Sequence, residues 1–166
     1  MIFPLVLIIL AFICLLIILS LVLPKQRIVT KQSVYDASPQ TVYNIVTDNN
    51  DWTYRSDLSN LQIIEKQGDI EAWKETDRKG NVILFRTKEK VPCSFYSFDM
   101  KSRIFTGYWT AYFEELPEGK TLFTATEHIR INNPIIKVLS YLFFDIGKYM
   151  EKYQSDLDLK IKKEGQ

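Results

Sequence analysis

The chain has 166 residues, enough for one domain and a short additional segment. It carries 21 Lys and Arg residues against 20 Asp and Glu residues, a formal net charge of +1, and the two signs are interspersed after residue 24. The charge therefore gives no indication of a nucleic-acid partner, and we expect a solvated globular surface.

Residues 2–23 form an apolar run without a single charged residue. A helix of this length spans about 33 Å, enough for a hydrocarbon core of about 30 Å. A cleaved signal peptide would have a basic residue before a shorter run and a small-residue cleavage site, and both are absent here. We therefore predict a retained transmembrane anchor over residues 1–24, with residues 25–166 as the second domain and the membrane as a partner of residues 2–23.

The flanks of this run predict its orientation. Lys25, Arg27 and Lys31 follow it, whereas only the α-amino group precedes it. The positive-inside rule then places the following domain on the cytoplasmic side of the membrane.

Alternating residues over 28–36 predict a strand, and Ser38 and Pro39 then provide an N-cap and a first helical residue. Further strands are predicted at 61–66, 70–76, 82–90, 94–101, 104–115 and 121–131. Because turn residues connect them over short distances, we expect an antiparallel sheet of about seven strands.

The periodicity becomes helical after Asn133 and Pro134. Apolar residues then recur at three- and four-residue steps, which predicts one helix over 134–163, roughly 45 Å long. We expect an α+β domain in which this C-terminal helix covers one face of a curved antiparallel sheet.

Strand alternation predicts which side chains face that helix. The more apolar faces of the last two strands carry Phe105, Gly107, Trp109, Ala111 and Phe113, and Phe123, Ala125, Glu127, Ile129 and Ile131. Glu127 therefore belongs to the interior, whereas His128, the only histidine, belongs to the outer face.

Glu127 has two interpretations. A carboxylate on an apolar face is either paired with a cation or near solvent, or it lies in a pocket where burial raises its pKa and where it orients a ligand. The sequence leaves open which applies, and whether the interior is filled or hollow.

Motifs for catalysis and cofactors are absent from the sequence. We find no GxSxG, P-loop, GxGxxG or HExxH pattern. Cys14 and Cys93 form neither a CxxC motif nor a zinc-binding cluster. We therefore expect no cofactor and no metal site.

Three segments resemble those of a known family. They are "ASPQTVYNIVTDNNDW", "GNVILFRTKEKVP" and "FTGYWTAYFEELPEGKTLFTATEHIRINNPIIK". In this order they are similar to the entry strand and first helix, the central hairpin and the final strands of the START-like superfamily. This superfamily (SRPBCC) includes polyketide cyclase/dehydrase and lipid transport proteins and has the helix-grip fold of the birch pollen allergen. The resemblance covers residues 28–163.

The resemblance implies a cavity between the sheet and the C-terminal helix that takes lipids or other apolar molecules, without implying one activity. We favour a membrane-anchored domain that binds a hydrophobic ligand or lipid. The alternatives are a structural or protein-interaction module without a ligand, and a cyclase- or dehydratase-type enzyme that uses Glu127 as acid or base. The predicted ligand-binding residues are Trp73, Phe85, Phe98, Phe105, Trp109, Phe123, Glu127, Ile129, Leu139 and Phe143.

Overall fold

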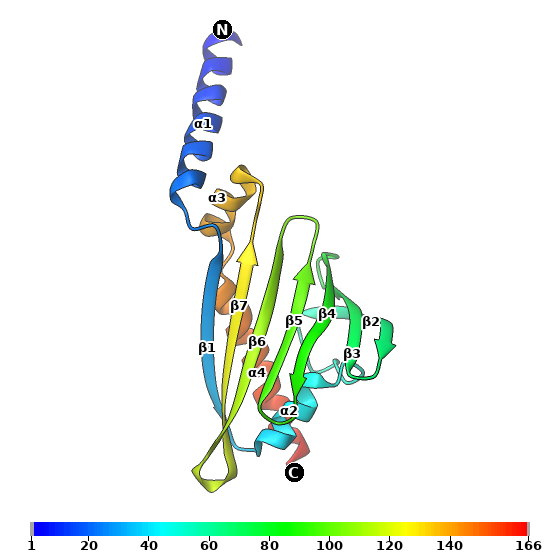
Figure 1. Ribbon diagram of the computed structural model, residues 1–166. Coiled ribbons are helices and arrows are strands. Elements are labelled where there is room, and N and C mark those ends of the chain that lie inside the picture. The colour runs from blue at the N-terminus through cyan, green and yellow to red at the C-terminus, as the bar shows by residue number, and fades with distance from the viewer. Residues whose placement is uncertain (1, 166) are drawn as a thin grey trace.

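The computed structural model describes residues 2–165. Its elements in chain order are α1 (Ile2–Val22), β1 (Arg27–Tyr35), α2 (Pro39–Thr47), β2 (Leu58–Gln67), β3 (Ile70–Asp77), β4 (Val82–Val91), β5 (Phe95–Lys101), β6 (Thr106–Leu116), η1 (Pro117–Gly119), β7 (Lys120–Arg130), α3 (Pro134–Phe143) and α4 (Ile146–Glu164). Figure 1 shows α4 running along one face of the sheet and α1 extending away from it.

The sheet has seven strands in the order β1-β7-β6-β5-β4-β3-β2, and every neighbouring pair is antiparallel. This confirms the predicted antiparallel sheet and the α+β class. Each predicted strand is present, and β2 begins earlier than expected, at Leu58. The chain returns β7 beside β1, so that the last strand before the terminal helices lies next to the first strand.

Short polar caps define where the helices begin. Ser38 accepts a hydrogen bond from the Thr41 backbone N–H ahead of α2, as predicted. Asn133 accepts hydrogen bonds from two backbone N–H groups at the start of α3, where Pro134 occupies the first turn. Each cap satisfies donors that have no partner within the helix.

The prediction of one continuous helix over 134–163 is wrong. The chain is extended at Phe144 and Asp145, which separates α3 from α4. The Asp145 side chain accepts a hydrogen bond from the Lys148 N–H and caps α4. Arg27 of β1 donates to the backbone carbonyls of Ser140 and Phe144, at 2.7 and 2.9 Å. The apolar periodicity continues through this break, which is why the sequence pattern does not reveal it.

Helix α1 contains a segment, Phe3–Val22, that is long and apolar enough to cross a membrane by length and composition, with a mean hydropathy of 3.5. Most of its side chains are exposed in the isolated chain. Its contacts with the domain are concentrated on α3.

The core lies between the concave face of the sheet, α2 and α4. The predicted inward faces of β6 and β7 are confirmed, because Trp109, Ala111, Phe123 and Ala125 are all buried. Gly107 faces the same way, and a Cβ atom there would lie 2.2 Å from the backbone oxygen of His128 on β7. The close approach of β6 and β7 at this point therefore requires glycine.

Candidate functional site

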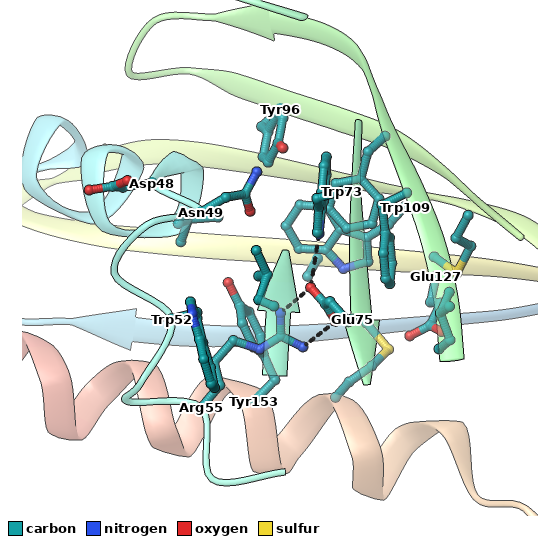
Figure 2. Close-up of a pocket in the computed structure, with 18 of the residues that line it drawn as sticks. Asp48, Asn49, Trp52, Arg55, Trp73, Glu75, Tyr96, Trp109, Glu127 and Tyr153 are labelled. Carbon is teal, nitrogen blue, oxygen red and sulfur yellow. Dashed lines mark hydrogen bonds and ion pairs between the residues drawn. The ribbon is translucent and has the colours of Figure 1, made fainter. Parts of the chain in front are cut away.

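A pocket lies between the sheet, α4 and the loop that connects α2 to β2. Its cavity volume is about 90 Å³, room for roughly six to nine water molecules. Figure 2 shows Asp48 and Asn49 at one end, Glu127 at the other, and Trp73 and Trp109 between them.

Four aromatic side chains, in two stacked pairs, form the sheet wall of the pocket. Trp73 and Phe85 are cross-strand neighbours whose rings stack at a centroid distance of 5.2 Å. Phe98 and Trp109 are neighbours on β5 and β6 and stack at 4.9 Å. Phe98 also meets the Trp73 ring edge-to-face at 5.3 Å. Each of the strands β3, β4, β5 and β6 contributes one aromatic residue, and together the four rings form an apolar wall on the sheet side of the pocket.

A buried ion pair lies beside this wall. Both terminal guanidinium nitrogens of Arg55 donate to the Glu75 carboxylate, at 2.6 and 3.0 Å. The Trp73 indole N–H also donates to Glu75, at 3.0 Å. Arg55 lies over the Tyr153 ring of α4, with its guanidinium carbon 5.3 Å from the ring centroid. Arg55 thus links the loop, the sheet and the C-terminal helix.

The loop over residues 48–57 is fastened to α4 by polar contacts. Asp156 accepts hydrogen bonds from the Ser56 backbone N–H and hydroxyl, at 2.8 and 2.7 Å. The Tyr149 hydroxyl donates to Asp57 at 2.8 Å. These bonds hold the loop as a side of the pocket, although its sequence is rich in turn residues.

Glu127 stands apart from this network. Within residues 2–165 its carboxylate has no hydrogen-bond or ion-pair partner, although it projects from β7 into the pocket. Burial raises its pKa to about 7, and the positive charge of Arg55 opposes this increase. The pocket therefore contains a carboxyl group that exchanges its proton near neutral pH and has free acceptor positions.

A second polar group in the pocket wall is also unpartnered. The Tyr96 side chain is 1% exposed, and its hydroxyl has no hydrogen-bond partner among residues 2–165. Burial raises the pKa of this phenol, so the hydroxyl remains a neutral donor. Such groups cost free energy unless a water molecule or ligand satisfies them.

The structure brings five of the ten predicted ligand-binding residues to the pocket: Trp73, Phe85, Phe98, Trp109 and Glu127. The other five do not line it. Phe123 and Ile129 are buried in the core, and Phe105 packs against its margin. Leu139 and Phe143 lie on α3 and are exposed, Phe143 by 82%. The break before α4 turns α3 away from the sheet, which is why Phe143 does not reach the pocket. A ligand-binding role stays a prediction for the five that line it.

Sequence reasoning missed the polar side of the pocket. Glu75 shares a strand face with Trp73, two residues earlier, so alternation could have identified it as a buried acid. No periodicity marks Arg55, because it lies in an irregular loop and its partner is on a strand. Tyr149 and Tyr153 belong to the predicted helix, but the apolar stripe did not reveal their positions beside a cavity.

The outward position of His128 is confirmed. Its ring stacks on Tyr108 of β6 at a centroid distance of 4.0 Å, and burial lowers its pKa. The Lys88 ammonium group lies over the same Tyr108 ring, 5.3 Å from its centroid. His128 therefore does not take part in the pocket.

The structure is similar to several solved proteins. The Zhui aromatase/cyclase from Streptomyces sp. R1128 matches with a TM-score of 0.75 and 9% identity, over 85% of this chain and 96% of that one. A START superfamily protein from Mycobacterium smegmatis matches with a TM-score of 0.65 and 16% identity, over 82% and 97%. Norcoclaurine synthase from Thalictrum flavum matches with a TM-score of 0.65 and 8% identity, over 82% and 86%.

These similarities confirm the resemblance inferred from the sequence. The chain has the helix-grip fold of the START superfamily, preceded by an apolar helix. No protein-family model and no curated protein matches the sequence. At such identities the similarity establishes the fold, and function has to be argued from the pocket.

Proposed function

We propose that this domain binds a small amphiphilic molecule, with its apolar body against the stacked aromatic wall and its hydrogen-bond donor directed at Glu127. The observation that carries the proposal is the unpartnered Glu127 carboxyl group in a cavity lined by Trp73, Phe98 and Trp109. The fold that this chain shares with an aromatase/cyclase supports a ligand-binding role.

The size of the cavity restricts the ligand. About 90 Å³ of cavity corresponds to roughly 180–270 Å³ of displaced liquid water. This is below the roughly 300 Å³ at which ligand pockets usually begin, so a sterol or phospholipid does not fit the interior as it stands. One or two fused rings do fit. The proposed ligand is therefore smaller than the lipid that the sequence and its resemblance led us to expect.

Glu127 selects the polar end of this ligand. A carboxylate accepts hydrogen bonds and attracts cations, so an alcohol, phenol or amine is favoured and a carboxylic acid is disfavoured. A hydrogen bond to a charged acceptor contributes about 1.5–3 kcal/mol. The ligand's donor also relieves the cost of leaving Glu127 buried without a partner.

Native mass spectrometry of the full-length chain, released from detergent micelles, tests the proposal. We expect a bound small molecule, no larger than a bicyclic amphiphile, that is lost from the Ala125→Leu variant. Ala125 lines the pocket, so the added carbons fill the cavity. A wild-type protein that emerges empty and binds no small aromatic alcohol would support a ligand-free interaction module instead.

Proton transfer is the second candidate function, and the raised pKa of Glu127 favours it. A carboxyl group with a pKa of about 7 exchanges protons readily at neutral pH. 2-Tetralone, a bicyclic ketone, is a suitable probe because a base exchanges its α-protons. If the protein is an enzyme of this kind, the uptake of deuterium by 2-tetralone should rise with pH through about 7 and should be absent with Glu127→Gln. Exchange at the rate of solvent alone would leave binding as the function.

We further propose that α1 anchors the domain in a bilayer, with the pocket on the cytoplasmic side. The length and hydropathy of Phe3–Val22 support the anchor, and Lys25, Arg27 and Lys31 after it support the orientation. A membrane-impermeant maleimide applied to intact cells should leave a Leu159→Cys variant unlabelled until the cells are lysed. Labelling before lysis would place the domain on the outer side of the membrane instead.

A further inference from the structure

Helix α3 has an apolar face that nothing within residues 2–165 covers. Leu142 is 67% exposed, Phe143 82% and Phe144, just after the helix, 52%. Leu139 of the same helix is 38% exposed. Exposed groups of large apolar side chains usually mark a contact with a protein or a membrane.

The same helix is attached to the C-terminal turns of α1. The Lys137 ammonium group donates to the backbone carbonyls of Ser20 and Leu23, at 2.8 and 2.9 Å. Ser20 lies in the last turn of α1 and Leu23 follows that helix directly, so neither carbonyl has an intrahelical donor. Lys137 is the only charged residue of α3, so this contact leaves the outer face of α3 without charge.

Side-chain burial shows how far α3 extends along α1. Leu16 and Ser20 are each 7% exposed within a helix that is otherwise open to its surroundings, and Val138 of α3 is 4% exposed. From Leu16 to Val22 a helix rises about 9 Å. Figure 1 shows α3 beside the base of α1, between that helix and the end of the sheet.

We infer that α3 lies in the membrane surface beside α1, with Leu142, Phe143 and Phe144 among the lipid acyl chains. The inference rests on the proposed anchoring of α1: if Phe3–Val22 crosses a bilayer, a helix packed on its last 9 Å or so shares that depth. Interfacial helices lie about 5–10 Å into this region. An apolar face without charge then meets hydrocarbon rather than water.

Seating α3 in the surface fixes the domain against the membrane. The connection between α1 and β1 is only a few residues long, and Arg27 at the start of β1 donates to the carbonyls of Ser140 in α3 and of Phe144 just after it. The anchor, α3 and the sheet are thus joined at one point, and the domain does not swing on its linker. The proposed pocket is held at a constant height above the bilayer.

Fluorescence quenching of the full-length chain in phosphatidylcholine vesicles tests this inference. Single-cysteine variants, in a background with Cys14→Ser and Cys93→Ser, carry an environment-sensitive fluorophore at Phe143→Cys. Leu10→Cys in α1 and Leu159→Cys in α4 are matched exposed controls. We expect doxyl-labelled lipid to remove most of the emission at positions 143 and 10, and aqueous cobalt to remove most of it at position 159.

The controls separate the two proposals. A label at position 143 that responds to cobalt as position 159 does would overturn the seating of α3 while leaving the anchor intact. Protection at position 143 from both quenchers would also overturn it, and would indicate a covering protein. A label at position 10 that responds to cobalt would contradict the anchor, and the inference about α3 would fall with it.

Discussion

Arg55 and Glu75 form a two-point ion pair inside the domain, with nitrogen–oxygen distances of 2.6 and 3.0 Å. Arg55 comes from an irregular loop and Glu75 from the middle of β3. Their side chains are 15% and 5% exposed, so the pair is largely shielded from water. It belongs to the lining of the pocket, beside Trp73 of the aromatic wall.

Removing one partner of this pair should strongly destabilise the domain. Arg55→Met leaves Glu75 buried without its cation, and we expect a loss of about 3–5 kcal/mol in the free energy of unfolding. Urea denaturation measures it. The exposed pair of Arg86 and Glu65 is the control, because Arg86→Met should cost less than about 1 kcal/mol. Equal losses in the two variants would contradict the assigned role of Arg55.

Glu127 should make stability depend on pH. Its pKa is about 7 in the folded chain, above the ordinary value of 4.5. Between these values the folded state binds more protons than the unfolded state, so the contribution of Glu127 to stability falls as pH rises through that window. The stability advantage of Glu127→Gln over the wild type should therefore grow by about 2–3 kcal/mol between pH 5 and pH 8.

Denaturation at the two pH values checks this difference. A Glu127→Gln variant whose advantage is the same at both pH values would show that burial does not raise the pKa. The charge of Arg55 lowers the pKa of Glu127, so neutralising Arg55 should move it upward in a variant that still folds. Carboxyl NMR signals of Glu127 report that shift directly.

The break between α3 and α4 depends in part on the Asp145 cap. Asp145→Ala removes the acceptor for the Lys148 N–H and should cost about 1 kcal/mol of stability. Asp145→Asn retains an acceptor oxygen and should restore most of this loss. Thermal unfolding of the three proteins measures the effect, and an alanine variant as stable as the wild type would mean that Arg27 alone maintains the break.

Gly107 should not tolerate a side chain. The Cβ atom of Gly107→Ala would lie 2.2 Å from the His128 carbonyl oxygen, so one of the two strands must shift. We expect a destabilisation of about 1–3 kcal/mol. Gly165→Ala is the control, since its Cβ would come no nearer than 3.7 Å to the backbone oxygen of Ile161. A Gly107→Ala variant that unfolds with the wild-type midpoint would refute the close approach of the strands.

The strands were predictable because their faces differ in composition. Alternation over 104–115 and 121–131 correctly placed Trp109, Phe123 and Glu127 inside and His128 outside. Period-two patterns survive in the sequence whenever one face of a sheet is buried. The aromatic half of the pocket could be predicted for the same reason.

The polar half and the helix break were not predictable in this way. Arg55 owes its position to a contact with a strand about twenty residues away in the chain, which no local pattern encodes. The apolar stripe after Pro134 continues across Phe144, although its α3 part and its α4 part pack against different surfaces. Phe143 was predicted to line the pocket because the whole apolar stripe was assumed to pack against the sheet.

Binding of 2-naphthol and of naphthalene to the full-length chain tests the proposed recognition most directly. The two probes share an apolar body and differ in one hydroxyl donor. At pH 8 we predict that the wild type binds 2-naphthol about 10- to 100-fold more tightly than naphthalene, and that Glu127→Leu binds both with similar affinity. Equal affinities in the wild type, or no binding of either probe, would contradict the account.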